Sequence, residues 1–74
     1  MDWSLFEKSV MDLAGRKPAE WRKGQAVFNA VDTLYGVART VQFVDGVDCF
    51  YDDSRIPDFL YRAWVRYEEM MRKQ

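Results

Sequence analysis

Apolar residues recur at intervals of three and four along most of this 74-residue chain, and this spacing constrains the fold most strongly. It places them along one face of an α-helix, whereas a half-buried strand would alternate at every second residue. The pattern predicts an all-α fold of three helices around one core. Without repeats or low-complexity segments, residues 1–74 are expected to form a single helical domain.

The first helix is predicted to follow Asp2, which is a good N-cap residue. Its apolar face holds four residues at helical spacing: Trp3, Phe6, Val10 and Leu13. We expect Gly15 to end this helix in the left-handed conformation, which glycine adopts freely.

The second helix is predicted to run from Ala19 or Glu20 to near Phe43. Its apolar face holds Trp21, Val27, Val31, Leu34, Ala38 and Val41. Gly24 and Gly36 lie inside this segment, where each costs about 1 kcal/mol relative to alanine. We expect close approach of another helix or loop to compensate, and Gly36 offers the alternative of dividing the segment in two.

Residues 41–50 are ambiguous, because Asp45-Gly46 between short apolar runs is a hairpin signal. An isolated two-stranded hairpin is marginally stable, so a helix end followed by a structured acidic loop is favoured over the α+β alternative. The last helix is predicted after a cap at Asp53 or Ser54, with Pro57 in its first turn. Its inward face holds Ile56, Phe59, Leu60, Ala63, Tyr67 and Met70.

Composition narrows the classes of function. Three Trp, four Tyr and five Phe make a core plausible without metal or disulfide. The chain has no His and one Cys, which excludes His-based triads, Cys/His zinc sites and an internal disulfide framework. A free thiol, no visible signal peptide and no run of about 20 apolar residues predict a cytoplasmic protein that does not span a membrane.

Acidic residues gather in the middle of the chain. Residues 27–54 carry five Asp and one basic residue, a net charge of −4 within a chain of net charge −1. A cation would need several such carboxylates, but the spacing differs from that of an EF-hand. Capping of the last helix by Asp52, Asp53 and Asp58 is therefore favoured, and no cofactor or metal is expected.

Two motifs stand out, Arg22-x-Gly24-Gln25-x-x-Phe28-Asn29 and Asp48-x-Phe50-Tyr51-Asp52-Asp53-Ser54-Arg55-Ile56-Pro57-x-Phe59. On a helix, the three polar side chains of the first motif lie along one strip. The favoured interpretation is structural: Gln25 and Asn29 satisfy backbone groups of the acidic loop, while Arg22 meets one of its carboxylates. The alternative makes these residues the rim of a partner-binding face.

Together the two motifs resemble those of a group of short uncharacterised bacterial and phage proteins, over about residues 20–62. That group has Pro after the first Asp of the second motif, where this chain has Cys49. The resemblance implies a compact helical protein in a phage or prophage setting. It carries no activity and no catalytic residues.

The preferred hypothesis is a non-enzymatic protein that binds and modulates another protein, such as a host enzyme or defence complex if the chain is phage-encoded. Its predicted surface joins the acidic loop to aromatic residues: Asp45, Asp48, Asp52, Asp53, Tyr51, Trp21 and Trp64. Aromatic side chains are frequent energetic anchors of interfaces. Catalysis by Cys49 is not expected, because it has no His partner and neighbouring carboxylates disfavour its thiolate.

Two alternatives come from other classes. A nucleic-acid-binding accessory protein would contact phosphates through a basic segment, with Trp21 stacking on a base; its residues are Arg16, Lys17, Arg22 and Lys23. A structural homo-oligomer, such as a homodimer, would bury surplus aromatic side chains against its own copy. The second alternative predicts a stability that depends on protein concentration.

Overall fold

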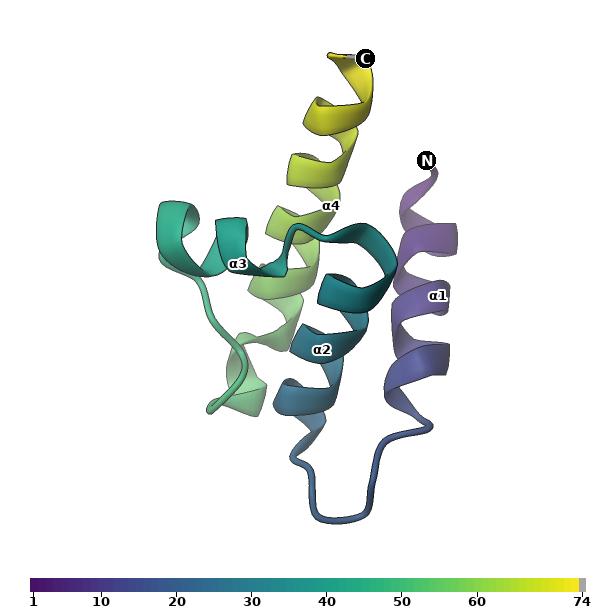
Figure 1. Cartoon of the computed structure of the whole chain (residues 1–74), viewed down its shortest axis with the longest axis vertical. Coiled ribbons are helices and arrows are strands. Elements are labelled where there is room, and N and C mark those ends of the chain that lie inside the picture. Colours follow the sequence, from purple (N-terminus) through teal and green to yellow (C-terminus); the bar gives the residue numbers. More distant parts are fainter. Residues whose placement is uncertain (74) are drawn as a thin grey trace.

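The computed structural model describes residues 1–73, which form helices joined by short loops (Figure 1). The elements in chain order are α1 (Trp3–Ala14), α2 (Lys23–Tyr35), α3 (Ala38–Thr40), the π-helical turn η1 (Val41–Asp45), the 3-10 turn η2 (Asp53–Arg55) and α4 (Ile56–Arg72). Residues 1–73 contain no strand, so the all-α prediction is confirmed and the hairpin alternative at Asp45-Gly46 is wrong.

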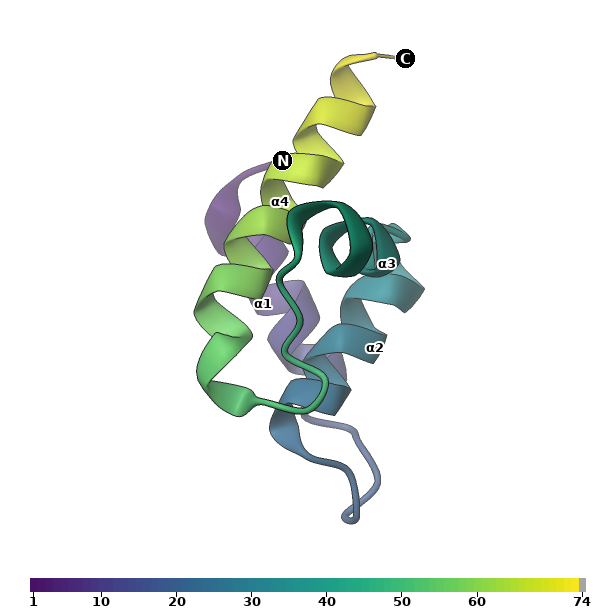
Figure 2. The ribbon, with the colours of Figure 1, turned by 90° about the vertical axis from the view of Figure 1, so that its left-hand side faces the viewer.

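Helices α1, α2 and α4 pack together, while α3 packs against α2 and η1 packs against α4 (Figures 1 and 2). Aromatic rings from the three long helices form much of the core. The ring centroids of Phe6 and Tyr35 lie 4.6 Å apart, and those of Phe28 and Phe59 lie 5.4 Å apart. Such contacts allow a short chain to bury a large apolar area without a disulfide.

A single copy of the chain has the dimensions expected for a compact domain of this length. Its radius of gyration is 11.4 Å, against about 11.3 Å expected for a domain of this length. Its accessible surface is 4802 Å², against about 4,800 Å² expected for its mass. Within residues 1–73, no helix combines the length and the apolar character needed to cross a bilayer.

The predicted second helix is divided and starts later than expected. Gly36 has a φ of 70°, which ends α2 and confirms the alternative of a break at that position. The start is delayed because the carbonyl of Trp21 accepts a hydrogen bond from Lys17 Nζ at 3.0 Å, while Arg22 is extended. Leu34, expected on the inward face, is 43% exposed near the end of the shortened helix.

Close packing against a loop explains why a glycine occupies position 24 of the chain. A β-carbon at this position would lie 1.9 Å from the carbonyl oxygen of Cys49, in the loop between η1 and η2. No side chain fits such a distance, so the expected close approach of a loop to this glycine is confirmed.

Three finer predictions are wrong. Gly15 follows α1 as expected, but its φ is −66°, so the helix ends without a left-handed residue. Asp52, rather than Asp53 or Ser54, provides the cap before the last helix, because a 3-10 turn precedes α4. Met70 is 40% exposed, since it lies on the last turns of α4, which extend past the other helices (Figure 1).

Candidate functional site

The acidic loop, residues 45–53, is held by its own carboxylates. Asp48 accepts hydrogen bonds from Phe50 N and from Gln42 Nε2, both at 2.8 Å. Asp53 accepts one at 2.8 Å from the backbone N–H of Gly24, an amide near the start of α2 that no helical carbonyl reaches. These contacts fasten the loop to η1 and to α2.

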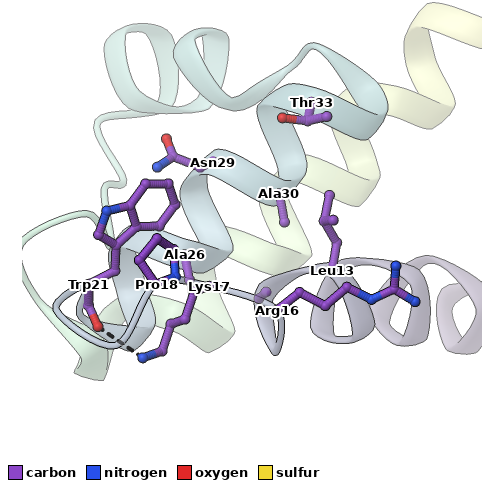
Figure 3. A pocket seen from close by; sticks show the side chains of 10 residues that line it. Leu13, Arg16, Lys17, Pro18, Trp21, Ala26, Asn29, Ala30 and Thr33 are labelled. Atoms are coloured by element: carbon purple, nitrogen blue, oxygen red, sulfur yellow. Dashed lines mark hydrogen bonds between the residues drawn. The ribbon is translucent and has the colours of Figure 1, made fainter.

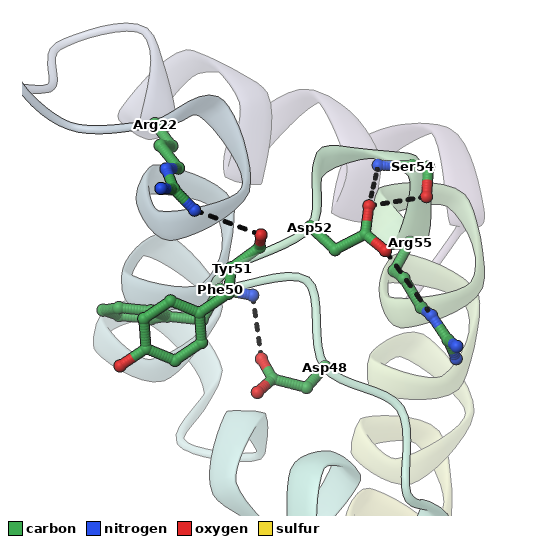
Figure 4. Close-up of polar contacts among 7 residues, drawn as sticks. All are labelled: Arg22, Asp48, Phe50, Tyr51, Asp52, Ser54 and Arg55. Carbon is green, nitrogen blue, oxygen red and sulfur yellow. Dashed lines mark hydrogen bonds and ion pairs between the residues drawn. The ribbon is translucent and has the colours of Figure 1, made fainter.

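The remaining two carboxylates of the loop are also engaged. Asp45 accepts hydrogen bonds from Arg66 Nη2 and Nε at 2.7 and 3.0 Å, which lowers the pKa of Asp45. Asp52 accepts bonds from Ser54 Oγ at 2.6 Å and Ser54 N at 3.0 Å, and these lower its pKa in turn (Figure 4). The loop carboxylates therefore fix the loop in place.

The strip on α2 contacts the loop differently from the expectation. Arg22 Nη1 donates to the carbonyl of Tyr51 at 3.2 Å, not to a carboxylate (Figure 4). Within residues 1–73, the Gln25 and Asn29 side chains make no hydrogen bond to the loop. The Asp side chains of the loop make the hydrogen bonds that were expected from Gln25 and Asn29.

Cys49 is buried in the loop, and its Sγ donates to the carbonyl of Gly24 at 3.3 Å. Burial, with a smaller contribution from the Asp48 charge, raises the pKa of Cys49 to about 12. The thiolate is the nucleophilic form of cysteine, so this side chain serves packing at neutral pH.

A groove of about 240 Å³ lies on the other side of α2, against α1 and the loop that joins them (Figure 3). Because 100° separates successive residues of a helix, Thr33 lies half a turn around α2 from Gly24, which faces the acidic loop. The groove is lined by residues of both helices and of the connecting loop: Leu13, Ala14, Arg16, Lys17, Pro18, Trp21, Ala26, Asn29, Ala30 and Thr33.

This groove, called the Trp21 groove from here on, is shaped by small residues on α2 and by the loop between α1 and α2. Ala26 and Ala30 are buried beneath it, and their methyl side chains leave room above the helix. The bond from Lys17 Nζ to the Trp21 carbonyl and a turn from Trp21 N to the Pro18 carbonyl at 3.1 Å close one end. These contacts fix the backbone of Trp21, and its partly buried indole forms one wall of the groove.

The structure thus groups the predicted residues in a new way. Arg16 and Lys17, predicted to bind nucleic acid, line the same groove as Trp21, predicted to bind protein. Arg22 contacts Tyr51 on the far side of α2, and Lys23 is exposed at the first position of that helix.

The other predicted aromatic residues lie elsewhere. Trp64 donates from Nε1 to the Met1 carbonyl at 2.9 Å and packs edge-on to Trp3, with ring centroids 5.7 Å apart. That places it by the N-terminus, whereas the loop with Trp21 lies at the opposite end of the molecule (Figure 1). The predicted surface is therefore divided among separate parts of the molecule.

Tyr51 is 74% exposed and packs against Phe50 (Figure 4). Both rings lie beside a hollow that Arg39 and Gln42 also line. Phe43, the residue after Gln42, is 78% exposed on η1. Phe43 does not line this hollow.

Sequence reasoning missed the apolar lining of the groove. The sequence predicts Leu13 on the buried face of the first helix. Ala26 and Ala30 carry no signal of their own, because alanine suits a core and a surface equally. Their spacing with Asn29 and Thr33, at positions i, i+3, i+4 and i+7, was the one clue to a shared face.

Among residues 1–73, no three Cys, Asp or Glu side chains converge as a metal site requires. The Trp21 groove combines an aromatic wall, an apolar floor and two cations at its edge, which suits a side chain of another macromolecule. No protein-family model, curated protein or solved structure matches this chain, so the groove itself is the main evidence on function.

Proposed function

We propose that this protein is a non-enzymatic binding protein that modulates another protein, which it engages through the Trp21 groove. The observation that carries the proposal is the indole of Trp21 standing over an apolar floor, in a groove that is open to solvent. Trp is among the residues that contribute most binding energy at protein interfaces. The resemblance to phage proteins implies a host protein as the partner.

The size of the groove supports a binding protein over an enzyme. Its volume of about 240 Å³ is below the roughly 300–1,000 Å³ of ordinary small-molecule sites. It suits one or two side chains of a partner rather than a whole substrate. The only cysteine, Cys49, is buried on the other side of α2 and does not line the groove.

Nucleic acid is the second candidate, because Arg16 and Lys17 lie at the edge of a groove that contains a Trp. Two features favour protein over nucleic acid. The Lys17 ammonium already bonds the Trp21 carbonyl, and the floor is alanine, which offers nothing to a phosphate. Homo-oligomerisation is less favoured, because nine of the twelve aromatic side chains are buried or partly buried in the single chain.

The test is capture of partners from host-cell lysate, with and without nuclease, read by mass spectrometry. Three baits are compared: the wild type, Thr33→Trp, which places a bulky side chain across the groove, and Thr40→Trp, the same change at an exposed position of α3. Trp and Thr have similar helix propensities, so both variants should fold, which circular dichroism checks.

The proposal expects one dominant nuclease-resistant protein that the wild type and Thr40→Trp retain and Thr33→Trp loses. Recovery that disappears with nuclease would support the nucleic-acid candidate. Absence of any partner, together with an unfolding midpoint that rises with protein concentration, would support self-association. Equal recovery by all three baits would place the partner outside the groove.

A further inference from the structure

The end of the molecule that carries the Trp21 groove is basic. Residues 15–23 contain Arg16, Lys17, Arg22 and Lys23 against one acid, Glu20, which gives a local net charge of +3 in a chain of net charge −1. None of the ion pairs among residues 1–73 uses these four cations. Their charge is therefore not neutralised by neighbouring side chains.

The carboxylates of the acidic loop do not compensate this charge. Asp45 pairs with Arg66, while Asp53 bonds the Gly24 amide on the opposite side of α2 from the groove. The carboxylates and the groove cations thus lie on different sides of the same helix. An apolar site with this positive edge favours a ligand that is apolar at its centre and negative beside it.

We infer that the Trp21 groove binds an acidic peptide segment of the partner protein, with one large apolar side chain as its anchor. The anchor lies against the Trp21 indole above Ala26 and Ala30, and a neighbouring Asp or Glu of the segment lies beside Arg16. This inference rests on the proposed function and adds the chemistry of the partner.

The polar residues of the groove fit a peptide. Asn29 is partly buried at the groove, and its amide can both donate to and accept from a peptide backbone. Lys17 is held by the Trp21 carbonyl at 3.0 Å, so the exposed Arg16 is the cation at the groove edge that can turn toward a ligand.

A displayed library of random twelve-residue peptides tests the inference. The library is selected on the immobilised full chain at low salt, and peptides that also bind Thr33→Trp are removed. The inference expects the remaining peptides to share an aromatic or large aliphatic residue with Asp or Glu nearby, and to carry net negative charge.

Charge reversal then tests Arg16 directly. The enriched peptides should bind Arg16→Glu roughly tenfold more weakly than wild type. They should bind Arg39→Glu, a control with the same charge change at an exposed position of α3, as tightly as wild type. Their affinity should also fall as salt screens the edge charges.

The outcomes separate this inference from the proposal beneath it. Groove-dependent peptides that are neutral or basic, or that bind both Glu variants equally, would overturn the acidic segment and leave the protein-binding groove standing. A selection that yields no peptide sensitive to Thr33→Trp would overturn the inference and the assignment of binding to the groove together.

Discussion

At Gly24 the backbone of α2 touches the acidic loop so closely that the identity of one residue decides whether the two fit. Alanine should favour the helix by about 1 kcal/mol. Its β-carbon, however, would meet the Cys49 carbonyl at 1.9 Å, and a backbone atom cannot move aside cheaply. We expect Gly24→Ala to lower the free energy of unfolding by roughly 1–3 kcal/mol, measured by urea denaturation.

Gly15→Ala is the matched control. Gly15 is right-handed, and the atom nearest to a β-carbon there is the Met11 carbonyl oxygen at an ordinary 3.4 Å. This substitution should leave stability unchanged or raise it by about 0.5–1 kcal/mol. Equal losses at the two glycines would contradict the close contact at Gly24.

The Asp45–Arg66 pair makes a prediction about pH. The pair lowers the pKa of Asp45 in the folded state below its unfolded value of about 3.9. Its contribution to stability is therefore present at pH values above the unfolded pKa and is lost as pH falls through the folded-state pKa. The difference in unfolding free energy between wild type and Asp45→Asn should be largest near pH 6 and shrink toward pH 2. Chemical denaturation of both proteins between pH 2 and pH 6 measures this difference. A difference in unfolding free energy that does not change with pH would contradict the pairing.

Among the elements, α1 and α4 could be predicted from the sequence, because their apolar spacing is uninterrupted between clear boundaries. The segment from Ala19 to Phe43 could not, since its spacing runs straight across Gly36. Whether that glycine is helical or left-handed depends on how α3 packs, which spacing does not encode. For the site, Trp21, Arg16 and Lys17 were identified, but their meeting around one groove depends on the late start of α2.

The break at Gly36 is testable on its own. Gly36 has a φ of 70°, and no atom lies within 4 Å of a β-carbon placed there. A side chain at this position would therefore destabilise the fold only through backbone strain. Gly36→Ala should lower the free energy of unfolding by roughly 1–2 kcal/mol, and Gly36→Asn by less, because Asn tolerates the left-handed region better. Thermal or urea unfolding of the two variants checks this order. Alanine as stable as glycine would mean that α2 continues into α3.

At the scale of the molecule, α2 separates two differently built faces. Toward the acidic loop it presents Gly24 and accepts close packing, whereas toward α1 it presents alanines and leaves a groove. The carboxylates of the loop serve the first face, and the cations of the α1–α2 connection border the second. The acidic loop therefore serves the structure, and we propose that the Trp21 groove serves recognition.

The most direct test of that assignment is calorimetric titration of the captured partner into folded wild type, Thr33→Trp and Thr40→Trp. Excluding the partner's anchoring side chain from the groove should weaken binding at least tenfold, which corresponds to about 1.4 kcal/mol of binding free energy. The account predicts this loss for Thr33→Trp and unchanged affinity for Thr40→Trp. Equal affinities for the two variants would contradict it and move the binding site away from Trp21.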